Sequence, residues 1–310
     1  MPALSTRGGA LSRIPRYPEK QTSVGVTGVC YFNHGATGTL YRSNTREKFT
    51  FATSAVVAST NLANMCANQS ATSNTSTGII ATGFNGANTP AKEKFIFSSE
   101  TSVITTSFTG YNTYSASIGN ATIALTQLGW GSTYTMTRNS HTYATDTVAL
   151  AASATSPSYA GCGFGIREYA LFSLGGTAAG PNVTIDKIVY ATGALTGYTA
   201  LGVGNSGGCA GGNGTSALVG IGNARTTYLV TYATATIVAG SLIPVKTIYG
   251  SVGANNTNLI FCLGGTDVTN ASNKKYNYTQ SSKTFALTTN SLVATWGGSA
   301  MSTTITGVND

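Results

Sequence analysis

The chain has 310 residues, of which only 8% are charged, whereas charged residues make up about 25% of an average soluble protein. This composition argues against long surface helices, which are rich in Glu and Lys, and the 41% of hydrophobic residues argue against disorder. The net charge of +8 comes from 17 basic and nine acidic residues without a dense Lys/Arg run, so nucleic acid is not an expected partner.

The first 22 residues differ from the rest and are predicted to form an extended basic arm. They contain no apolar stretch of the signal-peptide type, and no run in the chain approaches the roughly 20 apolar residues of a membrane span, so membrane insertion is not expected. The candidate partner-docking residues of the arm are Arg7, Arg13, Arg16 and Tyr17. They could anchor the protein to a partner by folding on binding, or the arm could be an ordinary unstructured leader.

Residues 23–310 are predicted to form one domain of six tandem repeats. Lys-Phe-Thr-Phe-Ala-Thr at 48–53 returns as Lys-Phe-Ile-Phe-Ser-Ser at 94–99 and in four further copies. The last aromatic residue of each copy lies at Phe51, Phe97, Tyr143, Tyr190, Tyr232 and Tyr278. Because these residues follow one another at steps of 46, 46, 47, 42 and 46, the period is about 46 residues.

Each repeat contains four short stretches typical of β-strands. An apolar stretch such as 78–84 precedes the aromatic one, in which alternation places Phe49 and Phe51 on the same face. A stretch rich in Val and Ala, such as 54–58, follows, and then one rich in Ser, Thr and Asn, such as 69–76. Four strands in about 46 residues predict an all-β, six-bladed β-propeller with four-stranded antiparallel blades.

The two ends of the repeat region indicate how the ring closes. Thr-Gly-Val at 27–29 returns at 306–308, so the chain stops where a seventh repeat would begin. We therefore expect the ends to be adjacent, with the N-terminal strand joining the last blade or sealing against it.

Five cysteines, at positions 30, 66, 162, 209 and 262, form no CxxC motif and do not recur with the repeat. An odd number of scattered cysteines predicts buried free thiols in a protein that folds in a reducing compartment. Asn-x-Ser/Thr sequences, for example at Asn74 and Asn120, are interpreted as a product of turns rich in Asn and Thr.

Two repeats contain an apolar run that ends in a glycine pair, Ala-Leu-Phe-Ser-Leu-Gly-Gly at 170–176 and Leu-Ile-Phe-Cys-Leu-Gly-Gly at 259–265. This pattern resembles the kelch repeat, in which the glycine pair ends one strand and permits a tight turn with positive φ. The other repeats lack the pair and the kelch Trp is missing, so the chain is similar to kelch propellers without being a standard member.

The six aromatic stretches also resemble those of tandem-repeat virion proteins of tailed bacteriophages, in which a Lys-Phe/Tyr-x-Tyr/Phe-Ser/Ala-Thr/Ser strand follows a Gly-rich segment. The similarity covers most of residues 27–305 and is one of repeat style. It implies a tail, fibre or decoration protein of a virion assembled in the host cytoplasm, present in several copies in a symmetric assembly and bound to other virion proteins. It implies no catalytic residue.

The sequence offers few groups for catalysis. His34 and His141 are the two histidines, about 107 residues apart, and His141 stands in the register of Phe49 and Phe95. Their registers do not match, which argues against a copper site of the galactose-oxidase type. The boxes of sialidase propellers are missing, and the acidic residues are scattered and not paired. We therefore expect no enzyme, no metal site and no cofactor.

Lysines recur three residues before the key aromatic residue in four repeats, at Lys48, Lys94, Lys187 and Lys275. They could form a basic collar that binds phosphate or acidic sugars. The alternative is that they are solvated residues that shield the strands from aggregation.

Aromatic residues gather between the second and third repeats, in predicted loops. The candidate glycan contacts are Tyr111, Tyr114, Trp130 and Tyr134, with Trp296 near the closure. Their rings could stack on sugars or could be buried between blades.

The sequence thus predicts a non-enzymatic, tail-associated virion component that docks to proteins and contacts host-surface glycan. A cellular, lectin-like propeller is the alternative, although a lectin should repeat its sugar contacts in successive blades.

Overall fold

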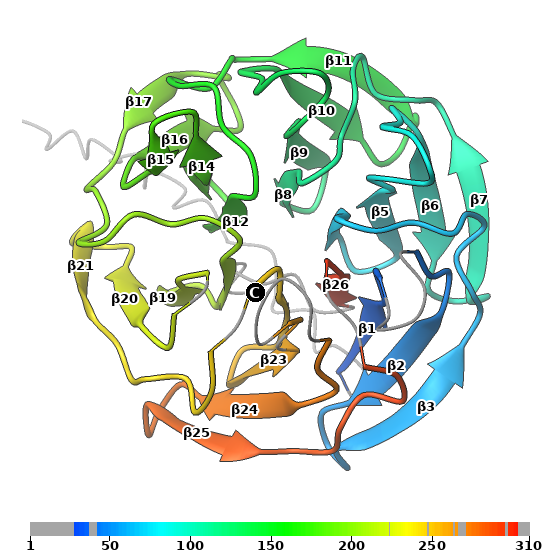
Figure 1. The fold of residues 1–310 in the computed structure, drawn as a ribbon, viewed down its shortest axis with the longest axis vertical. Coiled ribbons are helices and arrows are strands. Elements are labelled where there is room, and N and C mark those ends of the chain that lie inside the picture. The colour runs from blue at the N-terminus through cyan, green and yellow to red at the C-terminus, as the bar shows by residue number, and fades with distance from the viewer. Residues whose placement is uncertain are drawn as a thin grey trace, which may run out of the picture.

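Six four-stranded antiparallel sheets surround a central axis, which confirms the predicted six-bladed β-propeller (Figure 1). The computed structural model describes residues 28–36, 42–222, 224–246, 248–262, 264–265, 271–294 and 297–302. In these ranges no helix is long and apolar enough to cross a membrane. The predicted arm at 1–22, with Arg7, Arg13, Arg16 and Tyr17, lies outside the described residues, and so does Trp296.

Four sets of equivalent strands build the blades. The innermost set comprises β26 (Ser299–Ser302), β4 (Ser70–Ser73), β8 (Ala116–Gly119), β12 (Cys162–Gly165), β18 (Cys209–Gly212) and β22 (Ser251–Ala254). The second set comprises β1 (Val29–Asn33), β5 (Thr77–Ala81), β9 (Ile123–Gln127), β13 (Tyr169–Ser173), β19 (Ser216–Gly220) and β23 (Asn258–Cys262). The third set comprises β2 (Arg46–Thr50), β6 (Lys92–Ile96), β10 (Arg138–Thr142), β16 (Ile185–Val189), β20 (Thr227–Thr231) and β24 (Lys275–Thr279). The outermost set comprises β3 (Ala55–Ser59), β7 (Thr101–Thr105), β11 (Thr147–Ala151), β17 (Leu195–Gly197), β21 (Thr236–Ala239) and β25 (Thr284–Leu287).

Blade 1 is the sheet β26-β1-β2-β3, and blades 2 to 6 follow in chain order. A small hairpin, β14 (Gly176–Thr177) and β15 (Gly180–Pro181), stands between the second and third strands of blade 4. The sequence repeat is offset from the blade by one strand, because its polar fourth stretch forms the innermost strand of the next blade. The stretch at 69–76, for instance, contains β4 of blade 2.

The ring is closed by the C-terminal strand in the first blade and not, as predicted, by the N-terminal strand in the last blade. The C-terminal strand β26 joins the first blade, where it pairs antiparallel with β1 and sets Cys30 opposite Ser302. Met301 of β26 is buried, and its sulfur fills the space beside Gly78 of blade 2, where an added Cβ would lie 2.1 Å from it. The last blade is complete without the N-terminal strand, since β22 to β25 all come from one stretch of chain.

Apolar side chains between neighbouring blades form the core. Phe164, Leu171 and Ile185 of blade 4, for example, belong to one buried cluster with Val219 and Val230 of blade 5. Such clusters recur around the ring, and burial of this apolar surface is the main source of stability. The blades are thus held by side chains on both faces of each sheet.

Buried ion pairs join several blades in addition. The first residue of a third strand is paired with the second residue of the next blade's third strand, as in Arg46–Glu93 at 3.1 Å and Arg138–Asp186 at 2.6 Å. Lys275 of blade 6 is paired with Glu47 of blade 1 in the same way. Three of the acidic residues that look scattered in the sequence, Glu47, Glu93 and Asp186, are therefore buried partners of cations from a neighbouring blade.

The register of blade 6 differs from the predicted one by two residues. Tyr278 pairs with Leu259 and Phe285 and so occupies the place that Phe49 has in blade 1. The predicted alignment of Tyr278 with Phe51 is wrong. Since side chains alternate between faces with a period of two, a slip of two residues leaves the aromatic pattern unchanged.

The Asn-x-Ser/Thr sequences form the turns between innermost and second strands. Asn74 Oδ1 accepts hydrogen bonds from the N–H groups of Ser76 and Thr77, and Asn120 Oδ1 does the same for Thr122 and Ile123. These contacts explain why Asn recurs at this position, since an Asn side chain stabilises such a turn.

The predicted free cysteines are also confirmed, because all five are unpaired and buried.

Candidate functional site

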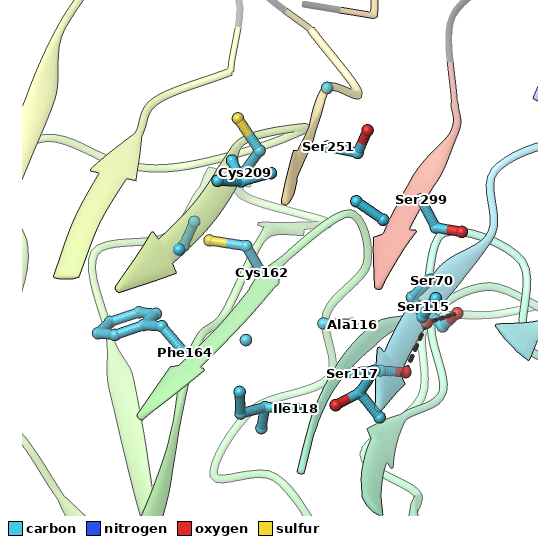
Figure 2. A pocket seen from close by; sticks show the side chains of 18 of the residues that line it. Ser70, Ser115, Ala116, Ser117, Ile118, Cys162, Phe164, Cys209, Ser251 and Ser299 are labelled. Carbon is cyan, nitrogen blue, oxygen red and sulfur yellow. Dashed lines mark hydrogen bonds between the residues drawn. The ribbon is translucent and has the colours of Figure 1, made fainter. Parts of the chain in front are cut away.

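The innermost strands are rich in Gly, Ala, Ser and Cys because six of them crowd around one axis. They enclose a central cavity of about 140 Å³ (Figure 2). No charged residue is found among the described residues that line this channel. The channel wall therefore presents hydroxyl groups, thiols, apolar side chains and backbone.

Hydroxyl groups on neighbouring blades bond to one another in the wall. Ser70 Oγ lies 2.7 Å from both Ser115 Oγ and Ser117 Oγ, and Figure 2 shows these bonds between β4 and the β8 region. Thiols line the other side at Cys162 and Cys209. Burial raises the pKa of Cys162 to about 12, so this thiol stays protonated and unreactive near neutral pH.

A ring of left-handed residues marks one end of the channel, two places before each innermost strand. φ lies between 54° and 73° at Asn68, Tyr114, Ala160, Gly207, Tyr249 and Gly297, which we call the mouth ring. The N–H of Tyr114 donates to Asn68 O at 2.9 Å, and the same bond continues through Ala160, Gly207, Tyr249 and Gly297 at 2.9, 2.8, 2.7 and 3.1 Å. Gln69 completes the circle by donating to Gly297 O at 3.2 Å.

Two tyrosines of the mouth ring cover the channel axis. Tyr114 precedes the innermost strand of blade 3 and Tyr249 that of blade 6, on opposite sides of the propeller. Their ring centroids are only 5.2 Å apart, with the planes tilted by 43°. Burial raises the pKa of both phenols, and the hydroxyl groups therefore remain hydrogen-bond donors.

Further aromatic rings continue from this pair towards the edge of blade 3. Tyr159 contacts Tyr114 edge-on at 5.8 Å and stacks on Tyr134 at 5.1 Å. Trp130 contacts Tyr134 at 4.7 Å. We call these four residues, together with Tyr249, the aromatic path. All of them are half-buried, so each presents part of its ring to solvent.

The loop that carries Trp130 and Tyr134 is fixed by its neighbours. The N–H of Trp130 donates to Thr113 O at 2.7 Å, and the Asn88 amide donates to Gly131 O at 2.7 Å. Gly129 allows this close approach, because a Cβ there would lie 2.3 Å from Thr113 O. Tyr111, whose side chain is 51% exposed, lies over Gly131 at the outer end of the path.

The structure thus brings together all four aromatic residues that the sequence nominated, Tyr111, Tyr114, Trp130 and Tyr134. It adds Tyr159 and Tyr249, which sequence reasoning missed. Their signal is positional, since Tyr249 occupies the same place before an innermost strand as Tyr114, and Tyr159 comes directly before such a place. That place cannot be found until the innermost strands have been assigned to blades.

The glycine pair at 175–176 has a different role from the predicted one. Neither residue has positive φ, and a Cβ at Gly175 would lie 1.9 Å from Tyr159 O. The pair therefore permits close backbone approach beside the aromatic path. In blade 6 the prediction holds, because Gly264 has a φ of 47°.

The prediction that the four lysines lie at equivalent positions around the ring is wrong. Lys275 begins β24 and is fully buried against Glu47, so it is neither part of a collar nor solvated. Lys48 is paired with Glu100 at 2.7 Å, and Lys187 lies 4.2 Å from the centroid of the Tyr169 ring.

The two histidines lie in separate junctions between blades. His34 Nε2 is 3.3 Å from Glu47 at the junction of blades 6 and 1. His141, which stands in the register of Phe49 as predicted, accepts a 2.6 Å hydrogen bond from Lys92 at Nδ1. Throughout the described ranges, no three His, Cys, Asp or Glu side chains are grouped so that they could hold a metal ion.

No protein-family model matches this sequence, and no curated protein matches it significantly.

Proposed function

We propose that this chain is a non-enzymatic structural component of a bacteriophage particle, associated with its tail, and that the aromatic path binds host-surface glycan while other surfaces dock to virion proteins. The observation that carries the binding part is the run of rings from Tyr249 through Tyr114 and Tyr159 to Trp130 at the channel mouth.

Partly exposed aromatic rings suit sugars because the C–H faces of a pyranose stack on π-systems, while phenol hydroxyls bond to its oxygens. No charged side chain lines the channel beneath the path among the described residues, which favours a neutral glycan over an acidic one. The hydrogen-bonded mouth ring holds the tyrosines in place, so little entropy is lost when a ligand binds.

The particle part of the proposal is supported by the repeat style of the six aromatic strands, which resembles that of tandem-repeat virion proteins. The absence of catalysis is supported by the chemistry of the channel wall. Its described residues are uncharged, and burial keeps its Cys162 thiol protonated, so the wall provides neither a general base nor a ready nucleophile.

A glycan array with the isolated protein tests the binding part. We expect binding to neutral glycans, and we expect Tyr111→Ala and Tyr134→Ala to weaken it about tenfold or more, which corresponds to about 1.4 kcal/mol. Leu242→Ala is the matched control, since Leu242 is 59% exposed in the equivalent connection between blades 5 and 6. Equal binding by all three variants would show that the aromatic path is not the glycan site.

Cryo-electron microscopy of the source particle tests the virion part separately. Propellers at a fixed copy number on the tail would support it, whereas a particle that lacks the chain would overturn it. If the chain binds glycan but is missing from particles, the alternative of a cellular, lectin-like propeller takes its place. That alternative is weakened by the aromatic path itself, because it occurs at one side of the ring and is not repeated blade by blade.

A further inference from the structure

Two Asn-Gly pairs occur in the chain, at 85–86 and at 213–214. Such a pair is prone to spontaneous deamidation, because glycine has no side chain that hinders the approach of its backbone nitrogen to the preceding carboxamide. The glycine nitrogen attacks Cγ of the asparagine, a five-membered succinimide forms and ammonia leaves. Water then opens the ring to an aspartyl or an isoaspartyl residue. The rate at each pair depends on the contacts that hold the reacting groups.

The Asn213 side chain is held in place in the turn between β18 and β19. Its Oδ1 accepts hydrogen bonds from the N–H groups of Thr215 and Ser216, both at 2.9 Å, and from Thr215 Oγ1 at 2.8 Å. Its Nδ2 donates to Asn256 O of blade 6 at 3.2 Å. The carboxamide has to leave these four partners before the Gly214 nitrogen can attack it. We therefore expect this pair to react slowly in the folded protein.

Asn85 and Gly86 lie in the loop between β5 and β6 of blade 2, where Asn85 is half-buried and Gly86 is exposed. Within the described ranges, no residue forms a hydrogen bond with the Asn85 carboxamide or with the Gly86 N–H. Both reacting groups are therefore free, in contrast to those of the pair at 213–214.

A cation from the neighbouring blade lies against this loop. Nη1 of Arg42, in blade 1, donates a hydrogen bond to the main-chain oxygen of Asn85. The guanidinium also lies beside Gly86, where an added Cβ would be 2.5 Å from Nη1. The Asn85 oxygen and the Gly86 nitrogen belong to the same peptide group, and both share the negative charge when this nitrogen loses its proton. A guanidinium bound to the oxygen therefore stabilises the anion that attacks Cγ.

We propose that Asn85 is a site of spontaneous deamidation, at which Arg42 promotes formation of the succinimide. The bond from Gly86 N to Asn85 Cγ forms and the bond from Cγ to Nδ2 breaks. The Gly86 proton leaves with Nδ2 as ammonia, and one water is consumed when the ring opens. The product adds a negative charge beside Arg42.

The modified loop also supports the aromatic path. Asn88, three residues further on, donates through Nδ2 to Gly131 O at 2.7 Å, in the loop that carries Trp130. An isoaspartyl product adds one carbon to the backbone just before this contact. The inference does not rest on the proposed function, because the reaction needs only the chain and water.

Peptide mapping by mass spectrometry, after incubation at neutral pH and physiological temperature, tests the inference. In the folded wild type, Asn85 should convert at least about tenfold faster than Asn213, whose hydrogen bonds have to break first. Arg42→Gln should slow the conversion of Asn85 about threefold or more, whereas Arg42→Lys keeps the positive charge and should retain most of the wild-type rate. Asn213 is the internal control and should convert at the same rate in all three proteins.

The same measurement in denaturant shows whether the fold sets the difference. In the unfolded chain the contacts of both pairs are lost, so Asn85 and Asn213 should convert at similar rates. Equal rates at the two sites in the folded wild type would overturn the inference. An Arg42→Gln variant that keeps the wild-type near-ultraviolet circular dichroism spectrum and converts Asn85 at the wild-type rate would refute the role of Arg42.

Discussion

The rings of Tyr114 and Tyr249 meet at 5.2 Å across the channel mouth, although their blades stand on opposite sides of the propeller. Both residues have positive φ, at 56° and 54°, a conformation that costs an L-residue roughly 1–2 kcal/mol. The backbone bonds of the mouth ring offset that cost and aim the two side chains at the axis. The pair therefore acts as a fixed cover over the cavity beneath it.

Removal of this cover should open the channel to reagents. In a variant with both Tyr114→Ala and Tyr249→Ala, we expect Cys162 and Cys209, which line the cavity, to react with a neutral maleimide at least about tenfold faster than in the wild type. Peptide mapping by mass spectrometry measures each site. Cys66, which is buried away from the channel, serves as the internal control. Unchanged rates at Cys162 and Cys209 would show that the tyrosines do not limit access.

A second set of left-handed residues occurs in the turns between third and outermost strands, where blade 4 has Gly193 and blade 5 has Ala235 with a φ of 51°. Ala235→Gly relieves the conformational cost at this residue but adds freedom to the unfolded chain, so the expected gain is about 0.5–1 kcal/mol. Chemical denaturation measures it. Ala149→Gly, at an exposed site inside β11, should instead lose about 0.5–1 kcal/mol. A loss of stability in Ala235→Gly would contradict the prediction.

The propeller fold could be predicted from the sequence because the aromatic residues of the third strands recur so regularly. Phe49 and Phe95 recur at the same place, where they fill the space between blades. The same pattern led to a wrong register for the third strand of blade 6. Tyr276 and Tyr278 alternate as Phe49 and Phe51 do, and a shift of two residues leaves each side chain on the same face of the sheet. As a result Lys275 was grouped with partly exposed lysines although its strand position is the fully buried one.

The candidate site could be predicted only in part, for a related reason. Tyr111, Tyr114, Trp130 and Tyr134 are close in sequence, so their clustering was visible. Tyr249 meets Tyr114 only because the ring closes and brings opposite blades to one axis. Contacts between blades likewise join residues nearly one repeat apart, such as Arg46 and Glu93, and no local pattern identifies such a pair.

The ion pair between Arg138 and Asp186 is fully buried, and Asp186 also accepts hydrogen bonds from the backbone and the side chain of Thr155. Asp186→Ala leaves a buried guanidinium without its partner and should cost about 3–5 kcal/mol of unfolding free energy. The double variant with Arg138→Leu and Asp186→Leu should lose clearly less unfolding free energy than the sum of the losses in the single variants Arg138→Leu and Asp186→Leu. The junction of blades 4 and 5 supports this, since Ile185 and Tyr228 pack there without ions. Additive losses in denaturant titrations would contradict the expectation.

His141 should make stability depend on mildly acidic pH. Burial, and then the nearby positive charge of Lys92, lower the pKa of His141 from 6.5 to about 4. Lys94 also lowers the pKa and Asp146 opposes the shift. In the unfolded chain the His141 side chain is therefore protonated near pH 6.5, whereas in the folded protein it is protonated only near pH 4. The histidine's contribution is complete above pH 6.5 and is lost as pH falls through this window, with a total of about 3 kcal/mol.

His141→Phe isolates this effect, because Phe49 and Phe95 occupy the same place in blades 1 and 2 and Lys92 keeps Asp146 at 2.9 Å. Unfolding free energies measured at half-unit steps of pH should fall between pH 6.5 and 4 in the wild type and stay nearly level in the variant.

Glu47 provides the internal reference at lower pH. Burial alone would raise its pKa, but contacts from His34 and Lys275 outweigh burial and lower the pKa from 4.5 to about 2. Its contribution is therefore present above pH 4.5 and lost between pH 4.5 and 2 in both proteins. A variant that keeps the slope above pH 4.5 would assign that slope to another group.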